Sequence, residues 1–139
     1  MSSATAGGAA LFAAHCAVCH GPAGTGLPGL APPLTSYPAR YANNKDGRRQ
    51  LAMTVLYGMF GEVSVDGKHF NFKMPTFAQL DDASLADVLN YVVFKLAKAP
   101  ADTRPLSPAD IAAERSQTED GQAVRRHRSA VLAELGFKN

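Results

Sequence analysis

The sequence contains no tryptophan and only two cysteines among its 139 residues. Two thiols allow at most one disulfide, which excludes a small scaffold held together by several disulfides. Long apolar runs are also missing: no stretch of about eighteen apolar residues occurs, and this excludes a membrane-spanning helix. A formal net charge of +2 gives no reason to expect a nucleic-acid partner. With 46% apolar residues, the chain is long enough for one domain with its own core.

Basic residues are missing from the start of the chain and concentrated at its end. Residues 2–8 are Ser, Ala, Thr and Gly and include no Lys or Arg, so we expect that a secretory leader is absent here or has already been removed. From Arg115 onward Lys and Arg outnumber the acidic residues, so any basic surface should lie on this tail. We expect three arginines of its last helix to point into solvent: Arg125, Arg126 and Arg128.

Hydrophobic periodicity and capping residues predict a mostly α-helical chain. Helices are expected over about 7–16, 48–59, 81–98, 107–117 and 118–135. Gly and Pro recur from Gly21 to Pro38 and predict a long loop. The segment EVSVDGKHFNF alternates around Asp66-Gly67, a dipeptide that favours a tight hairpin turn. We therefore expect several helices, one small β-hairpin and no internal repeat.

Both cysteines lie in one pentapeptide, Cys16-Ala17-Val18-Cys19-His20. This is the C-x-x-C-H pattern that attaches a c-type haem. Two thiols in one tight turn can each form a thioether to a different vinyl group of the porphyrin, while the adjacent imidazole reaches the iron. The pattern therefore predicts covalent haem attachment at Cys16 and Cys19, with His20 as an iron ligand.

Four alternatives to haem compete for the two thiols: a chance match, a single disulfide, a redox-active dithiol and half of a zinc site. A redox dithiol should open a helix after a strand, whereas here a helix precedes the cysteines and a Gly/Pro loop follows them. Zinc would need further ligands, and the remaining histidines, His15, His69 and His127, are scattered along the chain. Motif and context together favour haem.

The order of features over about residues 4–98 resembles a class I cytochrome c. A first helix, CAVCH, a Gly/Pro loop, a middle helix, an MP dipeptide and a later helix carrying Tyr91 follow one another. The resemblance implies three to five helices around one haem c. It also implies that residues 1–99 form the cytochrome domain and that residues 100–139 are a helical extension packed on it.

The resemblance further implies that His20 binds the iron on one side and Met74 on the other. A thioether is a soft ligand that favours ferrous iron, and Pro75 would stiffen the loop that holds it. The alternatives to Met74 are ordinary core packing for that residue and ligation by Met59 or His69. Met53 and Met59 are the rival methionines, although both have the spacing of core residues on the middle helix.

In the same family a proline carbonyl accepts a hydrogen bond from the second ring nitrogen of the iron-binding histidine, which orients the ring. In the segment LAPPL we favour Pro32 over Pro33 for this role. Candidates for the walls of the haem site are Phe12, Leu34, Tyr57, Phe60, Phe72 and Phe77. Candidates to reach the haem propionates are Tyr37, Arg40, Tyr41 and Arg48.

A narrower resemblance lies in GEVSVDG and NFKMP. These segments look like parts of the single-haem cytochromes, or fused cytochrome domains, that serve pyrroloquinoline-quinone dehydrogenases and copper nitrite reductases. The resemblance implies a redox protein partner, such as a quinoprotein dehydrogenase, a copper nitrite reductase or a terminal oxidase. It also implies a periplasmic location, because haem is attached outside the cytoplasmic membrane in such bacterial proteins.

With both axial positions of the iron filled by protein, the expected function is one-electron transfer through an exposed haem edge, not catalysis. We expect the partner to dock on small and apolar residues around that edge: Ala17, Val18, Pro22, Thr25 and Lys73–Phe77. The alternatives are a haem enzyme with an open sixth position, which would behave as a peroxidase or bind small gases, and a haem sensor module.

Overall fold

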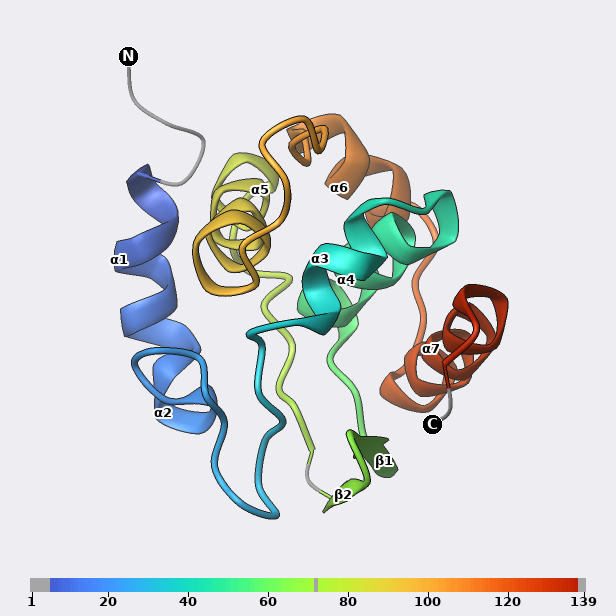
Figure 1. Ribbon diagram of the computed structural model, residues 1–139. Coiled ribbons are helices and arrows are strands. Elements are labelled where there is room, and N and C mark those ends of the chain that lie inside the picture. Colours follow the sequence, from blue (N-terminus) through green and yellow to red (C-terminus); the bar gives the residue numbers. More distant parts are fainter. Residues whose placement is uncertain (1–5, 72, 138–139) are drawn as a thin grey trace.

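A computed structural model describes residues 6–71 and 73–137 (Figure 1). The chain folds into helices and one antiparallel hairpin, which confirms the mostly α-helical class. In order, the elements are α1 (Ala6–His15), α2 (Ala17–His20), α3 (Tyr37–Ala42), α4 (Lys45–Tyr57), β1 (Glu62–Val65), β2 (Lys68–Asn71), α5 (Asp82–Asn90), the π-helix η1 (Tyr91–Leu96), α6 (Pro108–Arg115) and α7 (Gly121–Leu135). No helix in the described part is long and apolar enough to cross a membrane.

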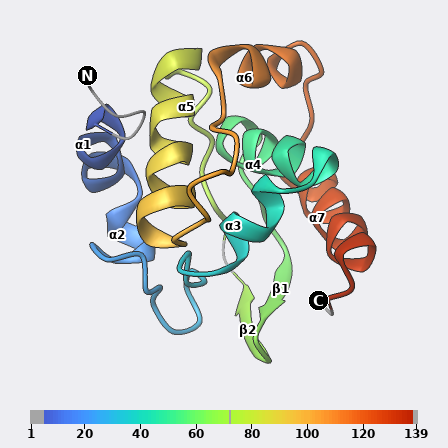
Figure 2. The ribbon, with the colours of Figure 1, turned by 45° about the horizontal axis from the view of Figure 1, so that its top comes forward.

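The first helix packs closely against α5, as both views of the ribbon show (Figures 1 and 2). At the contact point, a Cβ on Gly8 would collide with the carbonyl oxygen of Asp87 and with the Tyr91 side chain. One turn further on, Phe12 is 1% exposed and its ring lies 5.5 Å from that of Tyr91. The small residue thus lets the two backbones approach, and the aromatic pair fills the space beside them.

Several helix boundaries differ from the expected ones for local reasons. The middle helix α4 starts at Lys45, because the Asn44 side chain accepts a hydrogen bond from Gly47 N at 2.8 Å and caps it. Helix α3 falls partly within the expected loop, and Pro38 lies in its first turn, where proline is tolerated. The long helix after Asp81 changes to π geometry at Tyr91.

The hairpin forms where Asp66-Gly67 predicts it. Both turn residues have positive φ, 52° and 79°, and Val63 pairs with Phe70 across the strands. In Figure 2 the hairpin is at the bottom of the molecule, with α1 and α7 on opposite sides and α6 at the top.

The segment after residue 100 lies against the rest of the chain. Helix α6 packs on α4 and α5, and α7 packs on α4. Ile111 and Val124 are fully buried. Arg48 of α4 donates hydrogen bonds to the carbonyl oxygens of Arg104 (2.8 Å) and Pro105 (3.0 Å) and to Asp110 (3.1 Å). These contacts fix the linker and the start of α6 on the middle helix.

Candidate functional site

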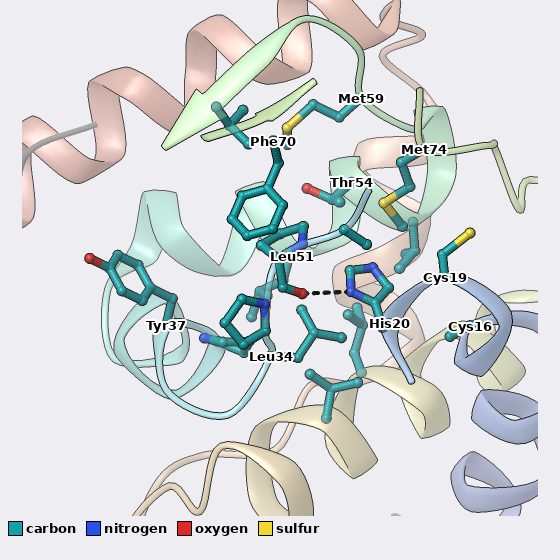
Figure 3. Close-up of a pocket in the computed structure, with 18 of the residues that line it drawn as sticks. Cys16, Cys19, His20, Leu34, Tyr37, Leu51, Thr54, Met59, Phe70 and Met74 are labelled. Carbon is teal, nitrogen blue, oxygen red and sulfur yellow. Dashed lines mark hydrogen bonds between the residues drawn. The ribbon is translucent and has the colours of Figure 1, made fainter. Parts of the chain in front are cut away.

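A large apolar cavity of about 250 Å³ lies between the CAVCH turn, the Gly/Pro loop, α4, the hairpin and α5 (Figure 3). Cys16, Cys19 and His20 all line it from one side, and Met74 lines it from the loop before α5. The sequence-predicted residues, distant along the chain, therefore share one cavity.

The CAVCH turn continues the direction of α1 for one more turn. His20 N donates to Cys16 O at 2.9 Å, so the two thiols and the imidazole stay on one short helical segment. The thiols are half-buried and are not joined to each other. Burial raises the pKa of the Cys16 thiol to about 11, and the nearby Cys19 adds to the shift. Reactive dithiols have lowered thiol pKa values, so this environment disfavours a redox dithiol.

The His20 side chain is 8% exposed and is held by the Gly/Pro loop. Its Nδ1 lies 2.9 Å from Pro32 O, and because a carbonyl only accepts, Nδ1 donates the proton (Figure 3). Burial lowers the pKa of His20, although the bond to Pro32 opposes this shift. The neutral ring therefore keeps a lone pair on Nε2, the atom a metal ion would use.

Two methionines line the cavity, Met59 and Met74. Their backbones form an isolated antiparallel bridge, in which Met74 N donates to Met59 O at 2.7 Å and Met59 N to Met74 O at 3.3 Å. Gly58, with φ 72°, makes room for this bridge, because a Cβ there would collide with Met74 O. In Figure 3 the Met74 side chain points toward the His20 ring.

The other two alternatives to Met74 lie elsewhere. Met53 is 4% exposed, packs in the core and does not line the cavity. His69 is on the exposed side of the hairpin, where its Nδ1 lies 3.1 Å from Ser64 Oγ and 3.2 Å from the Glu62 carboxylate. Of the three rivals, only Met59 shares the cavity with Met74.

Three of the six proposed wall residues line the cavity: Phe12, Leu34 and Phe77. Tyr57 and Phe60 do not; Tyr57 instead donates a hydrogen bond to Glu114 O at 2.7 Å. Phe72 lies outside the described residues. Phe70, which was not among the candidates, is 5% exposed and lines the cavity from β2. Strand alternation marks it, because it pairs with Val63 on the same face.

Of the candidates for polar contacts to the propionates, some line the cavity and others do not. Tyr37 and Tyr41 line the cavity. Arg48 does not line the cavity. Its guanidinium donates hydrogen bonds to Ala42 O, the linker carbonyls and Asp110, so the expectation that it reaches the cavity is wrong. Arg40 is exposed and lies over the rings of Tyr37 and Phe137, 5.0 and 4.5 Å from their centroids.

The expectation that Arg128 points into solvent is also wrong. It is 6% exposed and lines the cavity, whereas Arg126 is exposed and Arg125 is half-buried against Gly61. A signal for this was present in the sequence, because Arg128 follows Val124 by four positions and precedes Val131 by three. Those spacings put it on the buried stripe of α7.

The residues around the cavity fit a covalently attached haem. Nowhere in residues 6–71 and 73–137 do three His, Cys, Asp or Glu side chains gather in a way that could hold a metal ion. What the cavity offers is two thiols, one oriented imidazole and two thioethers within an apolar lining. These are the groups that attach a porphyrin, bind its iron and keep water away.

Comparison with known proteins gives consistent matches. The family model described as cytochrome c matches residues 5–93. One cytochrome c-552 of Thermus thermophilus is 40% identical over 92 residues, which are 66% of this chain and 62% of that protein. A second Thermus thermophilus cytochrome c-552 is 41% identical over 87 residues, 63% of this chain and 66% of the relative. The chain thus covers less than two thirds of the length of either relative.

Proposed function

The chain belongs to the cytochrome c family and so binds haem c covalently, and from this premise we propose that it carries single electrons between redox proteins. In this proposal Cys16 and Cys19 form the thioethers, and His20 and Met74 are the two iron ligands. When bound, the haem supplies one-electron chemistry by cycling its iron between ferric and ferrous states.

One observation carries the proposal: the two thiols, the oriented imidazole and the Met74 thioether line one apolar cavity. The bond from His20 Nδ1 to Pro32 O holds the ring in one orientation and increases the basicity of Nε2. Met74 is held by the backbone bridge to Met59, and its soft sulfur favours the ferrous state. If His20 and Met74 both bind the iron, no position would stay open for a substrate, so we propose a carrier and not an enzyme.

The proposed docking face surrounds the CAVCH turn. Val18 is 76% exposed, more than any other large apolar residue in the described part. Pro22, Thr25 and Pro75 are exposed, while Met74 and Phe77 are partly buried. Redox encounters use small contact areas of this kind, which separate quickly after transfer. We propose a redox enzyme as the partner, of the quinoprotein dehydrogenase, copper nitrite reductase or terminal oxidase class, in the periplasm.

We also propose that residues 100–139 are a helical extension that belongs to the same folding unit as residues 1–99. The buried side chains of α6 and α7 and the bonds from Arg48 to the linker support this arrangement. Arg115 supports it as well, because it donates to Ala78 O at 2.7 Å, Leu80 O at 2.8 Å and Asp82 at 2.9 Å.

The test of the ligand set is the absorption spectrum of the oxidised protein, which should contain the long-wavelength charge-transfer band of methionine bound to ferric haem. Met74→Leu should abolish this band, lower the reduction potential and open the sixth position to added imidazole. Met59→Leu is the matched control, because it removes the other thioether of the same cavity and should keep the band. A band that survives in Met74→Leu and disappears in Met59→Leu would overturn the assignment. Absence of the band from the wild type would point to the open-site haem enzyme or sensor.

A further inference from the structure

Three hydrogen-bonded side chains connect the wall of the cavity with a titratable group on the C-terminal extension. Gln50 and Thr54 of α4 both line the cavity, and Gln50 is 1% exposed (Figure 3). Gln50 Nε2 donates to Thr54 Oγ1 at 3.0 Å, and Gln50 Oε1 lies 2.7 Å from Nδ1 of His127 on α7. The buried amide of Gln50 therefore joins the cavity to a half-buried histidine.

The hydrogen bonds determine which ring nitrogen of His127 carries the proton. The one hydroxyl proton of Thr54 is donated to Gln50 O at 2.7 Å, so Thr54 Oγ1 can only accept from the Gln50 side chain. The amide nitrogen of Gln50 thus faces Thr54, and its oxygen faces His127. Because this oxygen only accepts, Nδ1 of the neutral ring donates, and Nε2 is the atom that can take up a second proton.

Water and charged side chains lie around the outer side of the His127 ring. The ring lines a depression in the surface together with Asp46 and Arg49 of α4 and Glu134 of its own helix, so a proton can reach it from solvent. Burial and then the charge of Arg49 lower the pKa of His127 below the ordinary value of 6.5. Asp46, Glu134 and Glu114 of α6 oppose this shift. The ring therefore takes up its second proton in mildly acidic solution.

We propose that His127 is a proton-binding site coupled to the redox state of the haem, with Gln50 and Thr54 as the connection between the two. Reduction adds one electron from the redox partner, and Nε2 of His127 takes up one proton from water, so the total charge of the molecule stays the same. Charges joined by buried hydrogen bonds interact more strongly than charges separated by water. The ferrous state therefore favours the protonated ring, and by linkage the protonated ring raises the reduction potential equally.

The coupling makes the driving force for electron transfer depend on pH. Where the pH lies between the pKa values of His127 in the ferric and ferrous protein, a proton accompanies each electron and the potential falls as the pH rises. Outside this range the electron moves alone. The inference rests on the proposed one-electron function but not on the identity of the redox partner.

Nuclear magnetic resonance titration of the histidine ring protons in the wild-type holoprotein tests the coupling directly. The proton affinity of His127 should be about fivefold higher in the ferrous than in the ferric protein. His69, which is exposed on the hairpin, is the internal control and should differ much less because water and salt screen it. Equal proton affinities of His127 in the two redox states would overturn the proposal.

Two threonine substitutions test the connection. Thr54→Val removes the hydroxyl at the cavity end of the hydrogen bonds and keeps the shape of the side chain, so it should reduce the difference in His127 proton affinity between the redox states. Thr35→Val is the matched control, because it makes the same change at an exposed position outside the cavity lining, and it should keep the difference. An equal effect of the two substitutions would overturn the proposed connection.

Redox titration over a pH series measures the consequence for the potential. The wild-type midpoint potential should fall between mildly acidic and neutral pH, and His127→Asn should show a smaller fall. A pH dependence that is unchanged in His127→Asn would contradict the coupling.

The two proposals fail in different ways. If Met74 is not the iron ligand, the methionine charge-transfer band is missing from the wild type. If only the coupling is wrong, the band is present while His127 has the same proton affinity in both redox states. Should Thr54→Val not retain haem, the wild-type titration still decides.

Discussion

The role of a single residue in this protein depends on its hydrogen-bond partner, as two of its histidines show. Burial lowers the pKa of both His20 and His127. His20 donates to a backbone carbonyl beside the cavity, whereas His127 donates from Nδ1 to the Gln50 side chain at 2.7 Å, between α7 and α4. The same neutral tautomer thus orients a proposed metal ligand in one place and joins two helices in the other.

The His127 contact predicts a pH dependence of stability. Burial, and then the positive charge of Arg49, hold the folded-state pKa below the ordinary value of 6.5, so the unfolded chain takes up the proton first. The stabilisation is therefore complete above about pH 6.5 and is lost as the pH falls toward the lowered pKa. His127→Asn should show a smaller fall in melting temperature between neutral and mildly acidic pH than the wild type does.

His69→Asn is the control for this experiment, because His69 is exposed on the hairpin. Thermal unfolding followed by circular dichroism over the same pH series measures all three proteins. A wild-type pH profile that persists in His127→Asn would contradict the assignment.

At the scale of elements, the sequence predicts a helix boundary best where one capping side chain determines it. Ser107 caps α6 as expected, with a reciprocal bond from Ser107 N to Asp110. The last helix starts at Gly121 and not at 118, because Asp120 caps it through Ala123 N at 2.8 Å. The change to π geometry at Tyr91 has no such local signal.

Positions decided by tertiary packing are harder to predict. Arg48 and Arg128 are both charged residues on amphipathic helices. The spacing of Arg128 from Val124 and Val131 marks it as buried, but the helical pattern does not show which groups either guanidinium contacts. Their destinations, the linker carbonyls for one and the cavity for the other, lie 56 or more residues away along the chain. The C-x-x-C-H turn and Met74, by contrast, are recognisable because their chemistry fixes short spacings or residue type.

Helix α6 provides a test of whether the extension is one unit with the cytochrome domain. Ile111 is completely buried between α6 and its neighbours. Ile111→Ala should lower the free energy of unfolding by about 2–5 kcal/mol. The loss of helix content and the change in haem absorption should still occur in a single transition. Denaturant titration with both probes measures this.

Ala112→Gly, an exposed change in the same helix, should cost only about 1 kcal/mol. Two separate transitions in the wild type would contradict the single unit.

For the whole molecule, the CAVCH turn and α7 lie on opposite sides (Figures 1 and 2). Residues of the CAVCH turn, α7 and the hairpin all line the cavity. The extension therefore reaches the cavity through Arg128, away from the proposed docking face, in which Val18 is exposed. This division predicts that electron exchange depends on charge near Val18 and hardly at all on charge along α7.

Electron self-exchange between two copies of the protein measures this without a known partner. Val18→Glu places a negative charge on both proposed contact faces, and the repulsion should slow self-exchange about tenfold at low salt and less at high salt. Ala133→Glu adds the same charge to an exposed position on α7 and should leave the rate nearly unchanged, because α7 and the CAVCH turn are on opposite sides of the molecule (Figure 2). Line broadening in mixtures of oxidised and reduced protein gives the rate, and the methionine charge-transfer band checks that the iron ligands are retained. Equal slowing by the two substitutions would show that net charge, and not the CAVCH face, governs the encounter.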